Sequence, residues 1–318
     1  MGRIPFTKEK ILRRDWFGLN ETKWIRAVCA ILIILVHLTE NDFFPQNRVT
    51  NLIGKTGFIW VGLFFLLSGY GLVRNLLTRE KYKVNFLMPH LLRLLVPVYC
   101  AELVYLVLDA VIGNYDFRWD KIVVFTNYVS YSWYVVSIGT VYIVFYLSAI
   151  LTNRYTVEVF CGITLSAYVI FTKIQVSDVY YKGIIGIAIG ALLAVIQFKQ
   201  HLRNMSIFVI AVEILGALLF SICFDSTAVW HAAIVVGIAA SLSVGFQYFN
   251  PLVIFQLNRL SDISYEMYLV HGSLIMFFIR NSSRGQIAAG LVYLGTILTA
   301  YLIHETSKWV SRKLLRLL

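Results

Sequence analysis

Long runs of apolar residues, separated by short polar segments, follow one another along almost the whole chain. A helix that crosses the hydrocarbon core of a bilayer needs about 20 mainly apolar residues, with roughly 17 tolerated. The chain contains ten such runs, each ended by Asn, Pro or charged residues: 22–39, 56–77, 91–113, 133–152, 157–173, 182–198, 205–224, 228–248, 262–280 and 286–304. This pattern predicts an all-α integral membrane bundle of about ten transmembrane helices, with the least sharp boundaries around the fifth and sixth runs.

Hydrophobic residues make up 59% of the 318 residues and charged residues only 14%, whereas an average soluble domain carries about 25% charged residues. This balance excludes a soluble globule, a disordered chain and a secreted disulfide scaffold. The four cysteines lie within apolar runs without C-x-x-C spacing, so the sequence predicts neither disulfides nor a metal site. No repeat or soluble segment interrupts the runs, and residues 1–318 are expected to form one membrane domain.

Lys and Arg are distributed unevenly between alternate loops. If the N-terminus lies in the cytoplasm, 19 of the 28 Lys and Arg residues fall on the inner side and 8 on the outer side, while Arg26 lies within the first run. Cytoplasmic loops of membrane proteins are enriched in Lys and Arg. The distribution therefore predicts that both termini are cytoplasmic, which agrees with an even number of spans.

A net charge of +11 would indicate a nucleic-acid partner if the protein were soluble. Here the basic residues gather at the ends of the apolar runs, where anionic lipid attracts them, so membrane lipid is the expected partner and nucleic acid is not. Residues 1–21 and 305–318 interleave basic residues with Ile, Leu, Trp and Phe. Such segments are typical of amphipathic helices in the membrane interface.

Two ionisable residues, Arg26 and His37, lie within the first predicted span. Eleven positions at 100° each amount to three turns plus about 20°, so both side chains share one face of the helix. They are separated by a rise of about 16.5 Å, with Arg26 near the cytoplasm and His37 deep in the outer half. Arg26 could instead reach lipid headgroups and His37 could lie at the interface, but ionisable groups inside a membrane usually mark a functional site.

The third span opens with His90 and Arg93, which face the same way because they are three residues apart. With Arg26 they would form a positive cluster at the cytoplasmic mouth that suits phosphate groups, although the general cytoplasmic excess of basic residues explains them equally well. Pro97 is expected to kink this helix. In the second span, Ser68 and Gly69 would allow close helix packing, which accounts for them about as well as a site does.

The ninth span places Ser264, Tyr268 and His271 on one face. It therefore brings a second histidine to mid-membrane depth from another helix, for catalysis or for a packed structural role. The outer stretch 114–132, between the third and fourth predicted spans, is rich in aromatic residues. An interfacial aromatic belt and a platform that stacks sugars are both compatible with it.

The ordered set of these features resembles the acyltransferase-3 family of membrane enzymes, which acylate surface polysaccharides and other acceptors. Arg26 and His37 match its Arg-x10-His first helix. His90-x-x-Arg93 stands where many members have Arg-x-x-Arg, so half of the family's phosphate clamp is a histidine here. The other matching segments, which cover the rest of the chain in order, are Phe64–Tyr70, Trp133–Val135, Ile263–His271 and Tyr301–Glu305.

The resemblance implies a membrane O-acetyltransferase that moves an acetyl group from cytosolic acetyl-CoA, without a metal, to a hydroxyl of a surface polysaccharide or lipid-linked glycan in a bacterial plasma membrane. His37 would be the catalytic base or an acyl carrier. Glu40 would orient the His37 ring as in a triad, or it is only a surface charge of the outer loop. His271 is the other candidate catalytic residue. The expected ligands of the CoA are Arg26, His90 and Arg93, and the expected substrate-binding residues are Ser68, Tyr70, Trp133, Ser264, Tyr268 and Glu305.

Two other classes of protein fit a helical bundle with polar residues at its midplane. A transporter or flippase of a small molecule or glycolipid is one, although carriers usually show matching Gly/Pro breaks in two halves, and the five prolines are unevenly placed. A membrane-embedded partner or sensor module is the other. Incorporation of an acyl group would separate the enzyme from both, and absence of CoA binding would favour the partner module.

Overall fold

Every regular element in the described part of the chain is a helix. The computed structural model describes residues 17–79, 82, 85–113, 129–152, 155–177, 180, 183–199, 227–245 and 251–317. The helices are α2 (Leu19–Glu40), α3 (Arg48–Gly54), α4 (Gly57–Thr78), α5 (Leu87–Val111), α7 (Trp133–Thr152), α8 (Thr156–Lys173), α9 (Ile184–Lys199), α11 (Thr227–Gly245), α12 (Pro251–Asp262), α13 (Ser264–Arg280) and α14 (Gln286–Leu317). The all-α prediction is confirmed for these residues.

Six helical segments are long and apolar enough to cross a membrane: Leu19–Glu40, Arg48–Thr78, Leu87–Val111, Trp133–Thr152, Thr156–Lys173 and Gln286–Leu317. Two shorter apolar helices, Ile184–Phe198 and Ala233–Ser243, accompany them. The chain is thus a multi-pass membrane protein. The predicted span 205–224 lies outside the described residues, and the total of ten spans and the cytoplasmic position of both termini stay predictions.

Three boundaries differ from the apolar runs. The short helix α3 in the loop after α2 was not predicted, and its start is set by Asn47, whose side chain accepts hydrogen bonds from the backbone N–H groups of Val49 and Thr50. The amphipathic helix α12 precedes α13 as a separate element. At the C-terminus, α14 continues from the predicted span through 305–317, because no Gly or Pro interrupts it there.

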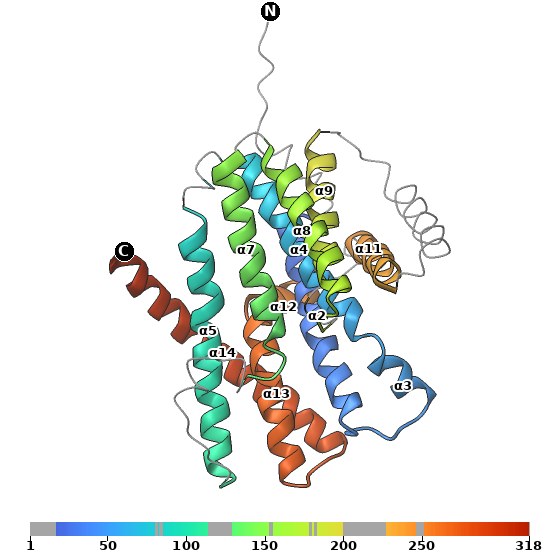
Figure 1. Cartoon of the computed structure of the whole chain (residues 1–318). Helices are drawn as coiled ribbons and strands as arrows, with labels where there is room; N and C mark the ends of the chain where they lie inside the picture. The colour runs from blue at the N-terminus through green and yellow to red at the C-terminus, as the bar shows by residue number, and fades with distance from the viewer. Residues whose placement is uncertain are drawn as a thin grey trace, which may run out of the picture.

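The helices pack in two groups (Figure 1). In the first group, α4 packs against α9, and α8 packs against α7 and α9. In the second group, α13 lies against α14, α5 and α2. Helix α2 joins the groups, since it also contacts α4 and α12. The crossing of α4 and α9 is close because glycines face backbone there. A Cβ atom at Gly69 would lie 2.1 Å from the carbonyl oxygen of Ile187, and one at Gly190 would lie 2.0 Å from that of Leu66.

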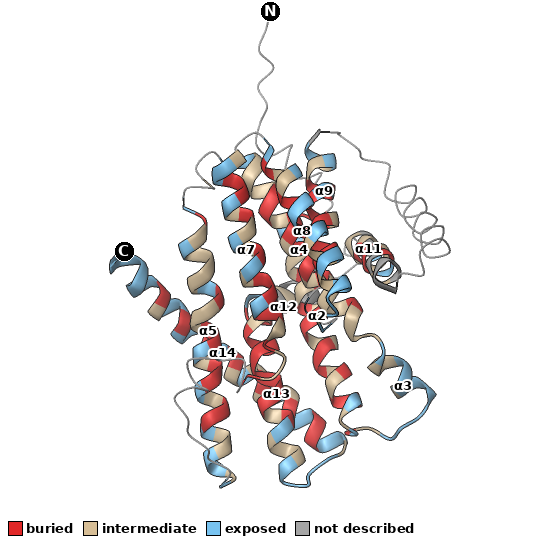
Figure 2. Cartoon of the chain, viewed as in Figure 1, coloured by how far each residue is buried: buried red, intermediate tan, exposed pale blue. Residues whose placement is uncertain are grey.

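Buried positions follow the inner faces of α2, α4 and α13, whereas much of α3 and the C-terminal part of α14 is exposed (Figure 2). Helix α13 is among the most enclosed elements, since ten of its residues are buried, including His271. A hydrogen bond joins α2 to α14, since the Tyr293 hydroxyl on α14 donates to the carbonyl of Ile31 on α2 at 2.9 Å. Of the residues predicted to act, His271 therefore lies in the core of the bundle.

Candidate active site

Two cavities lie side by side within the bundle. The first, of about 380 Å³, is lined by His37, Tyr131, Trp133, Tyr268 and His231 together with apolar residues of α2, α4, α9 and α11; we name it the histidine cavity. The second, of about 300 Å³, is lined by Arg26, His90, Arg93, Ser68, Ser264 and residues of α5, α7 and α13; we name it the arginine cavity. Val61 and Tyr268 belong to both linings, so the two cavities share a wall.

His37 lies near the C-terminal end of α2, where its side chain is mostly enclosed and faces the histidine cavity. Its Nδ1 atom lies 2.7 Å from Oε2 of Glu40, one turn further along the helix. When that nitrogen donates to the carboxylate, Nε2 is left with a lone pair. The pairing of an imidazole with a carboxylate three residues away is thus present, in the geometry that orients a catalytic base.

The rings of His37, Tyr131 and His271 lie nearly parallel to one another. The His37 imidazole stacks on the Tyr131 ring with centroids 3.9 Å apart and planes at 20°, and the His271 ring lies 5.2 Å from His37 and 5.1 Å from Tyr131. His271 is fully buried, and its Nε2 atom has no hydrogen-bond partner among the described residues. The structure brings the two histidines together, but His271 packs against the rings of His37 and Tyr131 and does not line the cavity.

Tyr131 stands in the segment before α7, and hydrogen bonds hold this segment against α13 and α5. The Tyr268 hydroxyl donates to the Tyr131 carbonyl at 2.8 Å, and the Ser130 N–H donates to the Tyr105 hydroxyl at 3.2 Å. Burial, with the negative charge of Glu40 nearby, raises the pKa of Tyr131 to about 12. The phenol therefore stays neutral beside the imidazole near pH 7, as a rigid stacking partner and hydrogen-bond donor.

Arg26 from α2 and Arg93 from α5 both line the arginine cavity. Within the described residues, neither guanidinium forms a salt bridge with a carboxylate. The Tyr265 hydroxyl donates to the carbonyl of Leu94 at 2.8 Å, which ties α13 to α5 beside Arg93. Two guanidinium groups without carboxylate partners in one cavity form a site for an anion such as phosphate.

His90 also lines the arginine cavity, but both of its ring nitrogens face partners of the protein. Its Nδ1 lies 2.7 Å from the carbonyl of Phe86, and its Nε2 lies 3.4 Å from the hydroxyl of Tyr82. The ring packs among Phe86 and Tyr142. The imidazole thus forms part of the cavity wall, and its hydrogen-bonding capacity is largely used by neighbouring residues.

The other predicted ligands fall into two groups. Ser68 and Ser264 line the arginine cavity, but each hydroxyl donates to a carbonyl of its own segment, Phe64 at 2.7 Å and Ser261 at 2.8 Å. Trp133 lines the histidine cavity and Tyr268 lines both. Tyr70 and Glu305 line neither.

Tyr70 points toward α9, where its hydroxyl donates to Oε1 of Gln197 at 2.6 Å. Glu305 is exposed on α14, and its Oε1 atom lies 3.5 Å from Nζ of Lys308. Both side chains are used in contacts away from the two cavities. The structure therefore does not bring these two residues together with His37.

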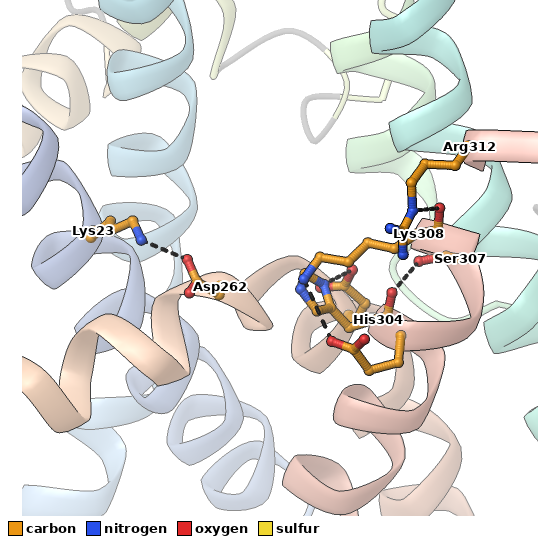
Figure 3. A network of polar contacts seen from close by, with 8 residues as sticks. Lys23, Asp262, His304, Ser307, Lys308 and Arg312 are labelled. Atoms are coloured by element: carbon orange, nitrogen blue, oxygen red, sulfur yellow. Dashed lines mark hydrogen bonds and ion pairs between the residues drawn. The ribbon is translucent and has the colours of Figure 1, made fainter. Parts of the chain in front are cut away.

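Sequence reasoning missed His231, which stacks on Phe58 with ring centroids 3.8 Å apart and faces the histidine cavity from α11. Its helix carried no motif and no second ionisable residue to signal it. Sequence reasoning also missed a largely buried pair that joins two helices. Nδ1 of His304 on α14 lies 2.9 Å from Oε1 of Glu266 on α13. Figure 3 shows His304 with Ser307 and Lys308 of the same helix and, in a separate place, the ion pair of Lys23 with Asp262.

The described residues hold no group of three or more His, Cys, Asp and Glu side chains suited to a metal ion. Comparison with curated proteins and with solved structures gave no match. The sequence model of the acyltransferase-3 family, which represents an acyltransferase domain, matches residues 19–305. This match covers nearly the whole chain and includes both cavities, and the chain accordingly belongs to the acyltransferase-3 family of membrane acyltransferases.

Proposed function

We propose that this acyltransferase carries an acetyl group from cytosolic acetyl-CoA to a hydroxyl of a surface polysaccharide or lipid-linked glycan in a bacterial plasma membrane. One observation carries the proposal: a cavity with two guanidinium groups shares a wall with a cavity that holds an imidazole paired to a carboxylate. The first suits the phosphates of a nucleotide-like donor. The second suits activation of a hydroxyl.

In this proposal, Arg26 and Arg93 bind phosphate groups of CoA, and His90 shapes the wall beside them. The pantetheine arm passes Val61 and Tyr268, the residues that belong to both cavities. The thioester then lies at His37. The rise of about 16.5 Å between positions 26 and 37 of one helix sets how far the thioester lies from the phosphates.

In the chemical step, His37 takes a proton from the acceptor and returns it to the leaving group. Nε2 takes the proton of the acceptor hydroxyl while the oxygen attacks the thioester carbonyl. When the tetrahedral intermediate collapses, the carbon–sulfur bond breaks and the imidazolium returns the proton to the sulfur. The products are the acyl ester of the acceptor and free CoA thiol. Glu40 stabilises the imidazolium through its 2.7 Å contact with Nδ1.

The remaining residues act on position or on substrate. His271 and Tyr131 hold the plane of the His37 ring through stacking. Trp133 offers an aromatic face in the histidine cavity to a sugar acceptor. The Tyr268 hydroxyl is already bonded to the Tyr131 carbonyl, so in this proposal Tyr268 holds the loop in place while its ring separates the two cavities.

Mass spectrometry of surface glycans tests the proposal directly. Cells that express the intact chain should carry acetylated glycans that are missing in cells with His37→Ala. An acyl adduct on His37 in the purified protein would assign the imidazole as acyl carrier in place of base. Movement of a glycolipid across the membrane without covalent change would contradict the proposal and favour a transporter.

A further inference from the structure

The histidine cavity is divided into a polar side and an apolar side. His37, Tyr131 and Tyr268 provide the polar side from α2, the segment before α7 and α13. The opposite side comes from α4, α9 and α11, and its side chains are Phe58, Phe65 and Val235, with His231 stacked flat on Phe58. Four glycines also line the cavity, namely Gly57, Gly62, Gly183 and Gly186. A Cβ atom at Gly62 would lie 2.6 Å from Val235 and one at Gly183 would lie 2.3 Å from Phe65, so these glycines let the helices pack closely around the cavity.

This space is much larger than an acetyl group needs. A cavity of about 380 Å³ holds roughly ten groups of the size of a water molecule, each of which takes about 30 Å³. The methyl of an acetyl thioester at His37 would fill about one of them. Nearly all of the apolar side would then be left without contact to the donor.

The apolar side does not suit the sugar acceptor. A bound sugar needs hydrogen-bond partners for its hydroxyls, and burial without them is costly. On this side the described lining offers one polar side chain, the His231 ring. An alkyl chain needs no such partners, and it gains free energy from each methylene that leaves water.

This inference rests on the acyl transfer at His37 in the proposed function and replaces its acetyl group: the geometry points to a donor acyl group longer than acetyl, whose alkyl chain lies between α4, α9 and α11 while its thioester lies at His37. Chains of about four to eight carbon atoms match the space once the thioester and the acceptor oxygen occupy the polar side. Acetyl-CoA is the smallest donor of this series. The acceptor hydroxyl then approaches Nε2 of His37, the ring nitrogen that Glu40 leaves free, away from the alkyl chain.

Binding of a chain-length series to the full chain in lipid nanodiscs tests this inference. Acetyl-, butanoyl-, hexanoyl- and octanoyl-CoA are titrated by calorimetry, with empty nanodiscs as the blank. Burial of each added methylene should tighten binding about two- to fourfold. Octanoyl-CoA should thus bind roughly 50-fold or more tightly than acetyl-CoA.

Val235 on the apolar wall provides the matched variants. Val235→Phe fills the cavity and should lower the octanoyl-to-acetyl affinity ratio about tenfold or more, whereas Ile234→Phe, on the exposed side of the same helix, should leave the ratio unchanged. A Cβ atom at Gly62 would lie 2.6 Å from Cγ2 of Val235, so the wall is crowded and Val235→Phe can fail to fold. Val235→Ala then serves instead, because it enlarges the cavity. The octanoyl-to-acetyl affinity ratio should be kept, and the gain in affinity with chain length should continue to decanoyl-CoA.

The outcomes separate this inference from the proposed function. If acetyl-CoA binds and the affinity stays within twofold along the series, the chain-length inference is overturned and the acyltransferase proposal stands. A ratio that Val235→Phe leaves unchanged would also overturn it, because the gain would then come from the surrounding lipid. If no CoA ester binds at all, the proposed function itself fails.

Discussion

Oε2 of Glu40 lies 2.7 Å from Nδ1 of His37, so the carboxylate of one helical turn orients the imidazole of the turn before it. The His37 side chain is largely enclosed, whereas that of Glu40 is about half exposed. This pair places one nitrogen of the ring toward the carboxylate and leaves the other for a substrate proton. It is the arrangement on which the proposed chemistry depends.

His37→Ala should abolish acyl transfer while the variant still binds acyl-CoA. Loss of a general base typically lowers a rate by a factor of about 10²–10⁴, and no other histidine of the described lining lies beside Glu40. Release of CoA thiol in the presence of acceptor measures the rate, and calorimetry measures donor binding. Transfer at the wild-type rate would refute the role of His37.

Glu40→Gln should reduce the rate about tenfold or more because the amide no longer stabilises the imidazolium. A purely structural role would lower stability without changing how the rate depends on pH. The measurement is therefore the pH profile of the transfer rate together with the unfolding temperature. Asp42→Asn, at an exposed carboxylate two residues beyond Glu40, is the control and should alter neither.

Arg26→Ala and Arg93→Ala should each weaken binding of acyl-CoA about 10- to 100-fold, because a hydrogen bond to a charged group contributes about 1.5–3 kcal/mol. The rate at saturating donor should change less than the affinity does. Arg312→Ala removes the same charge from the exposed part of α14 and should leave the affinity unchanged. Equal losses in all three variants would indicate a general electrostatic effect on binding.

Gly69→Ala should lower the unfolding temperature by several degrees, whereas Gly71→Ala should not. A Cβ atom at position 69 would lie 2.1 Å from the backbone carbonyl of Ile187, while one at position 71 meets no atom within 4 Å. Overpacking of this kind costs typically 1–3 kcal/mol. Thermal unfolding in detergent measures both variants, and equal stability would show that the α4–α9 crossing is looser than described.

Glu266→Gln should destabilise the contact between α13 and α14, because it removes the carboxylate that His304 faces at 2.9 Å in a largely buried place. Replacing both partners by apolar residues, as in Glu266→Met with His304→Leu, should recover part of the lost stability. Thermal unfolding of the single and double variants measures this coupling. If the double variant loses more stability than the two single variants lose together, the two residues do not stabilise each other as described.

The amino-acid sequence alone predicted most of the described helices and the relative placement of residues that share one helix. Apolar runs of bilayer length marked most of the described helices, and the helical repeat placed Arg26 and His37 on one face. Both inferences are local, because the length of a run and the turn of a helix depend only on neighbouring residues. The contact of Glu40 with His37 is local for the same reason.

Which residues of different helices meet was decided only by the tertiary structure. The stack of His37 with Tyr131 and His271 joins three distant segments, and the facing of His231 toward the same cavity depends on where α11 packs. Tyr70, expected at the substrate, lies instead against Gln197. The rotation and depth of each helix are set by the side chains of its neighbours. No periodicity within one segment contains that information, so the shared wall of the two cavities emerges only when the bundle is packed.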